Sequence, residues 1–157
     1  MLAIIIMGSP ADREFTEQIT QALDIYGIPW ELRIASAHKT PAYLLQMLTE
    51  YEQRPQAKVF ITVAGRSNAL SGMVDAAVQS PVIACPPYSS KFAGADIFSS
   101  LRTPSGVAPA LVLEPKNAAL LAAKVLGLTN PSLRARVAEQ QQRQRERLHS
   151  ADQSVQV

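Results

Sequence analysis

Polar side chains that could do chemistry gather in four short segments, each of which follows an apolar run. The segments are Gly8-Ser9 with Asp12, Ser36 with His38 and Lys39, Gly65-Arg66-Ser67-Asn68, and Ser89-Ser90-Lys91. A histidine beside cations and hydroxyls suits proton transfer next to a bound phosphate or carboxylate. If the fold brings these segments together, they form one ligand site.

His38 is the candidate for proton transfer, because histidine gains and loses a proton near neutral pH. The chain has two histidines, and the other, His149, lies in a polar C-terminal stretch. The alternative is a loop histidine that only bonds to a backbone carbonyl. No metal site is expected, since neither a second histidine nor a cysteine cluster accompanies His38.

The other loop residues favour an anionic ligand. Gly8 and Ser9 precede a predicted helix, whose free amides and dipole attract phosphate, and Asp12 could accept hydrogen bonds from sugar hydroxyls. The alternative is that Ser9 or Asp12 caps this helix. Lys39 and Arg66 have no acidic neighbour in the sequence. They suit a phosphate or carboxylate ligand, with surface salt bridges as the alternative.

The single cysteine, Cys85, ends an apolar run, so we expect a buried, unreactive thiol rather than a nucleophile. One cysteine cannot form an intramolecular disulfide, which favours a reducing compartment and a cytoplasmic location. The apolar stretch from Met1 to Met7 is too short for a signal peptide or a membrane span. No membrane partner is expected.

The elements that must position the loops alternate between apolar runs and stretches of helical periodicity, which predicts a parallel α/β fold. Strands are predicted at residues 2–7, 30–36, 59–64, 81–85 and 109–113. Helices are predicted at about 12–26, 41–53, 69–78, 94–101 and 117–126. The carboxyl ends of parallel strands share one edge of a sheet, and ligands bind there. The four polar segments should therefore meet.

The composition predicts one domain, and residues 1–131 of it carry no net charge. The chain has 157 residues, of which 47% are hydrophobic and 18% are charged. The charged share lies below the ~25% usual for soluble domains, which favours contacts between subunits. Residues 1–131 hold ten Lys or Arg and ten Asp or Glu, so the net charge of +2 belongs to residues 132–157. This small charge does not indicate a nucleic-acid binder.

The composition changes after Pro131 to arginine, glutamine and glutamate. Apolar residues there are too sparse for a coiled-coil seam. We therefore predict a single α/β catalytic domain over residues 1–131, and over residues 132–157 a polar helical extension that becomes disordered from Ser150. A solvated helix that packs on a neighbouring subunit is its simplest role. Nucleic-acid binding is not expected, because the arginines alternate with Gln and Glu and few aromatic residues are available for stacking.

Taken together, the loops resemble a known family, the aminoimidazole ribonucleotide carboxylases and carboxyaminoimidazole ribonucleotide mutases of de novo purine synthesis. The resemblance runs from about Ile4 to Leu128 and rests on Ile6-Met7-Gly8-Ser9 with Asp12, Tyr26-Gly27-Ile28-Pro29, Ser36-Ala37-His38-Lys39, Pro81-Val82-Ile83 and Asn117-Ala118-Ala119. With the alternation of elements, it implies a three-layer α/β sandwich with a mainly parallel, flavodoxin-like central sheet and a C-terminal helical extension. It also implies a homo-octamer.

Two branches of this family differ in the loops. The mutase branch typically has Arg after the loop histidine and a Gly-rich segment with a second histidine, whereas this chain has Lys39 and Ala64-Gly65-Arg66-Ser67-Asn68. Cys85-Pro86-Pro87 and residues 99–106 also resemble the other branch, which is familiar from animals. That branch carboxylates 5-aminoimidazole ribonucleotide (AIR) with CO2 at C4 to give the 4-carboxy product (CAIR). Thr40 is more like the mutase branch, so N5-carboxyaminoimidazole ribonucleotide (N5-CAIR) mutase is the alternative; a non-catalytic protein that binds a phosphorylated metabolite is another.

The resemblance implies a role for each loop residue. His38 would exchange the C4 proton as general acid and base, Asp12 would bind the ribose, and Lys39, Arg66 and the serines would hold the phosphate and the new carboxylate. The expected substrate-binding set is Gly8, Ser9, Asp12, Ser36, Lys39, Gly65, Arg66, Ser67 and Asn68. The expected partners are AIR and CO2. No metal, nucleotide or biotin is expected, because CO2 itself would be the one-carbon substrate.

Overall fold

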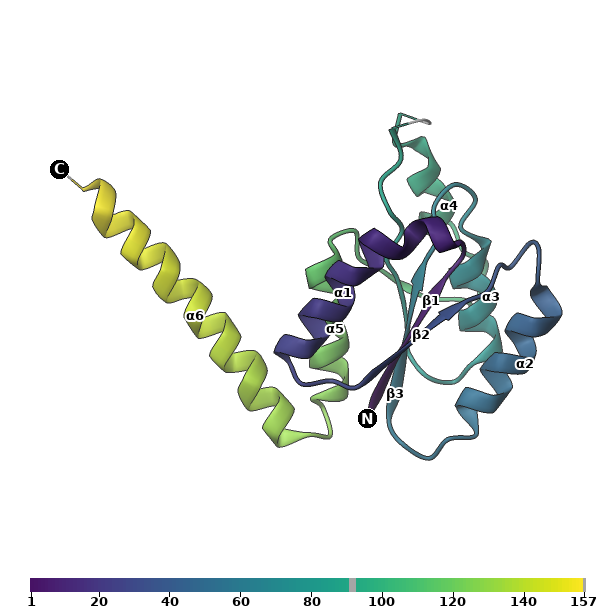
Figure 1. The fold of residues 1–157 in the computed structure, drawn as a ribbon, viewed down its shortest axis with the longest axis horizontal. Helices are drawn as coiled ribbons and strands as arrows, with labels where there is room; N and C mark the ends of the chain where they lie inside the picture. Colours follow the sequence, from purple (N-terminus) through teal and green to yellow (C-terminus); the bar gives the residue numbers. More distant parts are fainter. Residues whose placement is uncertain (91–92, 157) are drawn as a thin grey trace.

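A five-stranded sheet lies between two layers of helices in the computed structural model, which describes residues 1–90 and 93–156 (Figure 1). The strands are β1 (Leu2–Met7), β2 (Trp30–Ile34), β3 (Lys58–Val63), β4 (Val82–Ala84) and β5 (Ala110–Leu111). Their order is β2-β1-β3-β4-β5, and every neighbouring pair is parallel. The predicted three-layer α/β sandwich with a flavodoxin-like sheet is confirmed.

The helices alternate with the strands as predicted. They are α1 (Arg13–Ile25), α2 (Pro41–Glu52), α3 (Ala69–Ala77), α4 (Phe98–Leu101), α5 (Pro115–Leu126) and α6 (Pro131–Val155), with short 3-10 turns η1 (Pro10–Asp12) and η3 (Ala95–Ile97). None of the described helices is long and apolar enough to span a membrane. Strands β2, β4 and β5 are shorter than predicted, and Pro81 and Pro109, which cannot donate to a strand ladder, lie just before β4 and β5.

The buried strand β1 shows how the sheet is covered. Its residues alternate, with Ala3, Ile5 and Met7 packing toward α1 and α5, while Leu2, Ile4 and Ile6 pack toward α2 and α3. All six residues are buried, as expected for a continuous apolar run in a parallel sheet. The edge strand β2 is only half-buried, which fits its charged residues. The connections from β1 and β3 lead to opposite faces, and ligands bind at such a switch point.

Helix α6 differs from the sequence prediction at both ends. Its first turns belong to the core, since Leu133 is fully buried and Val137 is 8% exposed within the cluster that includes α1 and α5. The body of the domain therefore continues beyond the predicted boundary at residue 131. The predicted disorder from Ser150 is wrong up to Val155, because the helix continues to that residue. Beyond Val137 the helix projects away from the body (Figure 1).

Candidate active site

One cleft of about 840 Å³ lies at the carboxyl edge of the sheet, between the loops that follow β1, β2, β3 and β4. All of the predicted site residues except Asn68 line it, namely Gly8, Ser9, Asp12, Ser36, His38, Lys39, Gly65, Arg66 and Ser67. Residues far apart in the sequence thus share one site, as the parallel α/β pattern predicted. A single ligand in this cleft could contact an imidazole, two cations and a carboxylate.

Gly8 allows the loops after β1 and β3 to approach each other. A Cβ atom at Gly8 would lie 3.1 Å from the Cβ of Ala64. The Gly8 N–H also donates to the carbonyl oxygen of Val63 at 2.9 Å. A side chain at this position would push the two loops apart, and with them the residues that face each other across the cleft.

Ser9 and Asp12 play different parts in the first loop. The Ser9 hydroxyl accepts the Ala11 N–H at 3.2 Å and caps η1, the short turn that precedes α1, rather than α1 itself. The Asp12 carboxylate makes no capping hydrogen bond. Burial raises the pKa of the Asp12 carboxyl, against the opposing effects of a backbone hydrogen bond at Ser9 and the charge of Arg66. Asp12 is therefore a partly desolvated acceptor beside a cation.

His38 is carried by a tight turn that Ser36 and Thr40 close. The Ser36 N–H donates to Oγ1 of Thr40 at 2.9 Å, and the Lys39 N–H donates to Oγ of Ser36 at 3.2 Å. The Thr40 N–H donates to the Ser36 carbonyl oxygen at 2.9 Å. The turn leaves the His38 side chain exposed at the cleft. The sequence reasoning missed the part of Thr40, which the Ser-x-x-x-Thr spacing before Pro41 could have indicated.

The third loop contains an unusual backbone conformation at Arg66, whose φ is 58°. Non-glycine residues seldom adopt this left-handed region. The next polar residue, Asn68, differs from the prediction because it is buried and does not line the cleft. Its Oδ1 accepts the Ser71 N–H at 3.3 Å and its Nδ2 donates to Oγ of Ser100 at 2.8 Å. Asn68 therefore caps α3, and its amide is already engaged.

The fourth segment contributes residues that the sequence reasoning did not single out. Pro87 and Tyr88 line the cleft together with Ser89. Lys91, which was part of the predicted segment, lies outside the described residues. At the level of the sequence, Pro87 is used only within Cys85-Pro86-Pro87, as part of the branch resemblance, and nothing is assigned to Tyr88. A Pro-Pro-Tyr sequence gives no chemical signal of its own, which explains why they were missed.

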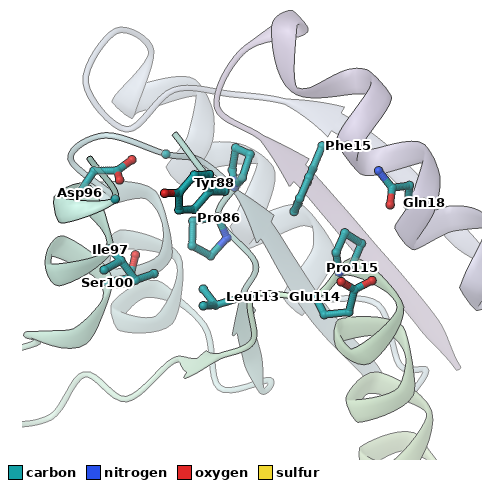
Figure 2. Close-up of a pocket in the computed structure, with 13 residues that line it drawn as sticks. Phe15, Gln18, Pro86, Tyr88, Asp96, Ile97, Ser100, Leu113, Glu114 and Pro115 are labelled. Atoms are coloured by element: carbon teal, nitrogen blue, oxygen red, sulfur yellow. The ribbon is translucent and has the colours of Figure 1, made fainter. Parts of the chain in front are cut away.

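A second, smaller pocket of about 350 Å³ adjoins the cleft and shares Gly65, Pro87 and Tyr88 with it. Figure 2 shows Phe15 on α1 and Pro115 at the start of α5 on one side of this pocket. Asp96, Ile97 and Ser100, from η3 and α4, lie on the opposite side. The lining of the pocket is largely apolar.

The thiol of Cys85 lies outside the cleft chemistry. Cys85 is a free cysteine that is fully buried. Desolvation, with a smaller effect from the charge of Glu114, raises the pKa of the Cys85 thiol to about 12. The prediction of a buried, unreactive thiol is confirmed. Among the described residues, no group of three or more His, Cys, Asp or Glu side chains is placed to hold a metal ion.

Comparison with known proteins identifies the family to which the chain is similar. The sequence model of the AIR carboxylase family matches residues 2–147. The phosphoribosylaminoimidazole carboxylase of Archaeoglobus fulgidus is 53% identical over 155 residues, which cover 99% of this chain and 85% of that protein. The enzyme of the same name from Treponema denticola is 58% identical over 127 residues, or 81% of this chain and 80% of that protein.

A solved structure extends the likeness to the whole fold. The crystal structure of Treponema denticola PurE matches this chain with a TM-score of 0.98 and 49% sequence identity, and the match covers 99% of each chain. The resemblance inferred from the loop motifs is confirmed. The chain belongs to the AIR carboxylase family of enzymes of purine biosynthesis.

Proposed function

We propose that this chain carboxylates AIR directly with CO2 at C4 to give CAIR, reversibly, with His38 as the general acid and base. One observation carries the proposal: the turn that holds His38 lines the same cleft as Asp12, Lys39 and Arg66. The second histidine, His149, lies on the exposed end of α6. Direct carboxylation needs one imidazole, which is what the cleft provides.

The chemistry requires a single proton transfer by the protein. The electron-rich C4 of AIR attacks the carbon of CO2 and forms the new carbon–carbon bond. C4 then carries both the carboxylate and its original hydrogen, and removal of that proton by neutral His38 restores the aromatic ring. The reverse reaction uses protonated His38. Because His38 is exposed at the cleft, water can take the proton away after each turnover.

The remaining residues bind and orient the substrate. Lys39 and Arg66 supply positive charge for the phosphate and the developing carboxylate. The Ser9 and Ser36 hydroxyl oxygens accept backbone N–H groups, yet each still has an O–H to donate to a phosphate oxygen. The carboxylate of Asp12, which caps no helix, is available for ribose hydroxyls.

The N5-CAIR mutase reaction is the second candidate, and Thr40 favours it. This residue resembles the mutase branch, and its hydroxyl accepts the Ser36 N–H that helps to close the histidine turn. A mutase would transfer the carboxyl group from N5 to C4 within the same cleft and would also need a C4 proton acceptor. The loop after β3, Ala64 to Asn68, lacks the histidine expected of that branch.

The two reactions are separated by giving the purified enzyme AIR with CO2 or N5-CAIR without added CO2. We expect CAIR from AIR, with a faster initial rate when the reaction is started with CO2 than with bicarbonate. Efficient conversion of N5-CAIR with none of AIR would contradict direct carboxylation. Tight binding of AIR without turnover of either compound would indicate a non-catalytic binding protein.

The proposal includes a cytoplasmic homo-octamer that binds neither nucleic acid nor membrane. The family resemblance implies the octamer, and the surface supports contacts between copies. Tyr88, Phe98 and Leu101 are 82%, 62% and 57% exposed. Apolar side chains exposed to this extent favour protein contacts when they lie close together.

A further inference from the structure

Segment 95–101, which consists of η3 and α4, forms hydrogen bonds with the backbone of the loop that carries Arg66. We propose that Asp96 and Ser99 are positioning residues that hold this loop so that Arg66 can bind the anionic part of the substrate. The proposal rests on the function proposed above, and it adds residues that do not line the cleft.

The Arg66 backbone needs external support. Its φ of 58° lies in the left-handed region, where the Cβ of an L residue is crowded. Such a conformation persists only when the surrounding structure fixes it. The Asp96 Oδ2 accepts the Arg66 N–H at 3.1 Å. This bond goes to the backbone, so it leaves the Arg66 guanidinium available to a ligand.

Ser99 holds the other side of the same peptide units. Its hydroxyl lies 2.8 Å from the Arg66 carbonyl oxygen and 2.7 Å from the Asp96 carbonyl oxygen, so its one proton is shared between them. The Ser99 hydroxyl also accepts the Asn68 N–H at 2.9 Å. The adjacent Ser100 receives the buried Asn68 side-chain amide at 2.8 Å. Segment 95–101 therefore fixes the loop at Arg66 and again at Asn68.

Segment 95–101 does not line the cleft in which the substrate is proposed to bind. Asp96 and Ser100 line the smaller pocket, on the side opposite α1, and not the cleft (Figure 2). Arg66 lines the cleft and not the smaller pocket. Asp96 thus lies outside the cleft and acts on the substrate through the loop, whose Arg66 N–H it accepts. The two ion pairs found among the described residues involve neither residue.

The test compares variants that remove or keep each contact. In Asp96→Ala and Ser99→Ala we expect the KM for AIR to rise about tenfold while kcat changes by less than about threefold, because the substrate phosphate is bound alike in the ground and transition states. Asp96→Asn retains a side-chain oxygen as acceptor, and Ser99→Thr retains the hydroxyl. Both should restore a KM close to that of the wild type.

Two controls separate positioning from general stability. Asp75 accepts the Ala108 N–H at 2.7 Å but lines neither cavity, so Asp75→Ala removes a similar bond elsewhere and should leave KM unchanged. If Asp96 acts through Arg66, adding Asp96→Ala to Arg66→Ala should not raise KM further. Effects that multiply in the double variant would overturn the proposal, as would an unchanged KM in Asp96→Ala and Ser99→Ala.

A binding measurement keeps this proposal separate from the proposed reaction. Absence of AIR turnover by the wild-type enzyme would count against the reaction alone. The Kd of ribose 5-phosphate, measured by calorimetry on the same variants, needs no turnover. We expect it to rise about tenfold in Asp96→Ala and to recover in Asp96→Asn. An equal Kd in wild type and Asp96→Ala would overturn the positioning role.

Discussion

At the scale of single residues, the cleft depends on side chains that shape loops as much as on those that face a ligand. His38 lies in a turn closed by Ser36 and Thr40. The sequence was sufficient to select His38, because histidine is rare in this chain and this one follows a strand. It was not sufficient for Thr40 or Asp96, whose importance comes from hydrogen bonds to backbone atoms that only the folded chain brings near.

The turn around His38 gives the first prediction. Thr40→Val keeps the shape of the side chain but removes the hydroxyl that accepts the Ser36 N–H. We expect kcat for AIR carboxylation to fall about tenfold, since a small misplacement of a catalytic group is costly. Thr40→Ser keeps a hydroxyl and serves as the control. Equal kcat values for Thr40→Val and the wild type would show that the turn does not need this bond.

Asp12 gives a prediction about stability and pH. Burial raises the pKa of its carboxyl above the ordinary value of 3.8, so the charged form is less favourable in the folded protein than in the unfolded chain. This penalty is complete above the raised pKa and vanishes below 3.8. Asp12→Asn should therefore raise Tm at neutral pH, with a gain that shrinks as the pH falls toward 3.8.

The same substitution should weaken binding of AIR, because the amide cannot replace the carboxylate as an acceptor of two hydroxyl donors. Thermal unfolding followed over a pH series, with calorimetry of AIR binding at neutral pH, measures both effects. A lower Tm at neutral pH together with unchanged binding would contradict the role given to Asp12. A gain in stability with a loss of binding is the usual trade-off at a functional site.

At the scale of elements, hydrophobic periodicity predicted the order and type of the strands and helices, because each strand is buried on the faces that its pattern indicates. The prediction failed at α6. Leu133 and Val137 are too sparse for a coiled-coil seam and fall within the predicted polar extension, yet they complete the core beside α1 and α5. A polar composition indicates exposure on average, and it cannot show which few side chains find a place in the core.

The two ends of α6 can be compared directly. Leu133 is fully buried, whereas Leu148 is 71% exposed. Leu133→Ala should lower the free energy of unfolding by about 2 to 5 kcal/mol, the range for deleting a buried leucine side chain. Leu148→Ala is the matched control and should cost less than about 0.5 kcal/mol within one subunit. Denaturant titration measures both, and equal losses would contradict the different burial.

At the scale of the whole molecule, low charge and exposed apolar side chains favour assembly. Residues 1–131 carry no net charge, and Tyr88, Phe98 and Leu101 are exposed around the smaller pocket and α4. The exposed part of α6 projects far from its own domain (Figure 1). The sequence predicts association from its composition, but the number of subunits depends on surface geometry that spacing does not encode.

Light scattering coupled to size-exclusion chromatography tests the assembly. From the family resemblance we expect a mass of about eight times the 17.0 kDa of one chain. The mass should persist on dilution through the concentrations used for the activity assay. A species of 17.0 kDa that is active at those concentrations would contradict the octamer.

The central claim is that His38 moves the C4 proton, and exchange of that proton with solvent tests it most directly. The wild-type enzyme, incubated with CAIR in deuterated water, should release AIR that carries deuterium at C4. His38→Asn should lower this rate by at least about a hundredfold, within the range for loss of a general acid or base. His149→Asn, the same change on exposed α6, should leave the rate unchanged. Exchange by His38→Asn at the wild-type rate would contradict the claim.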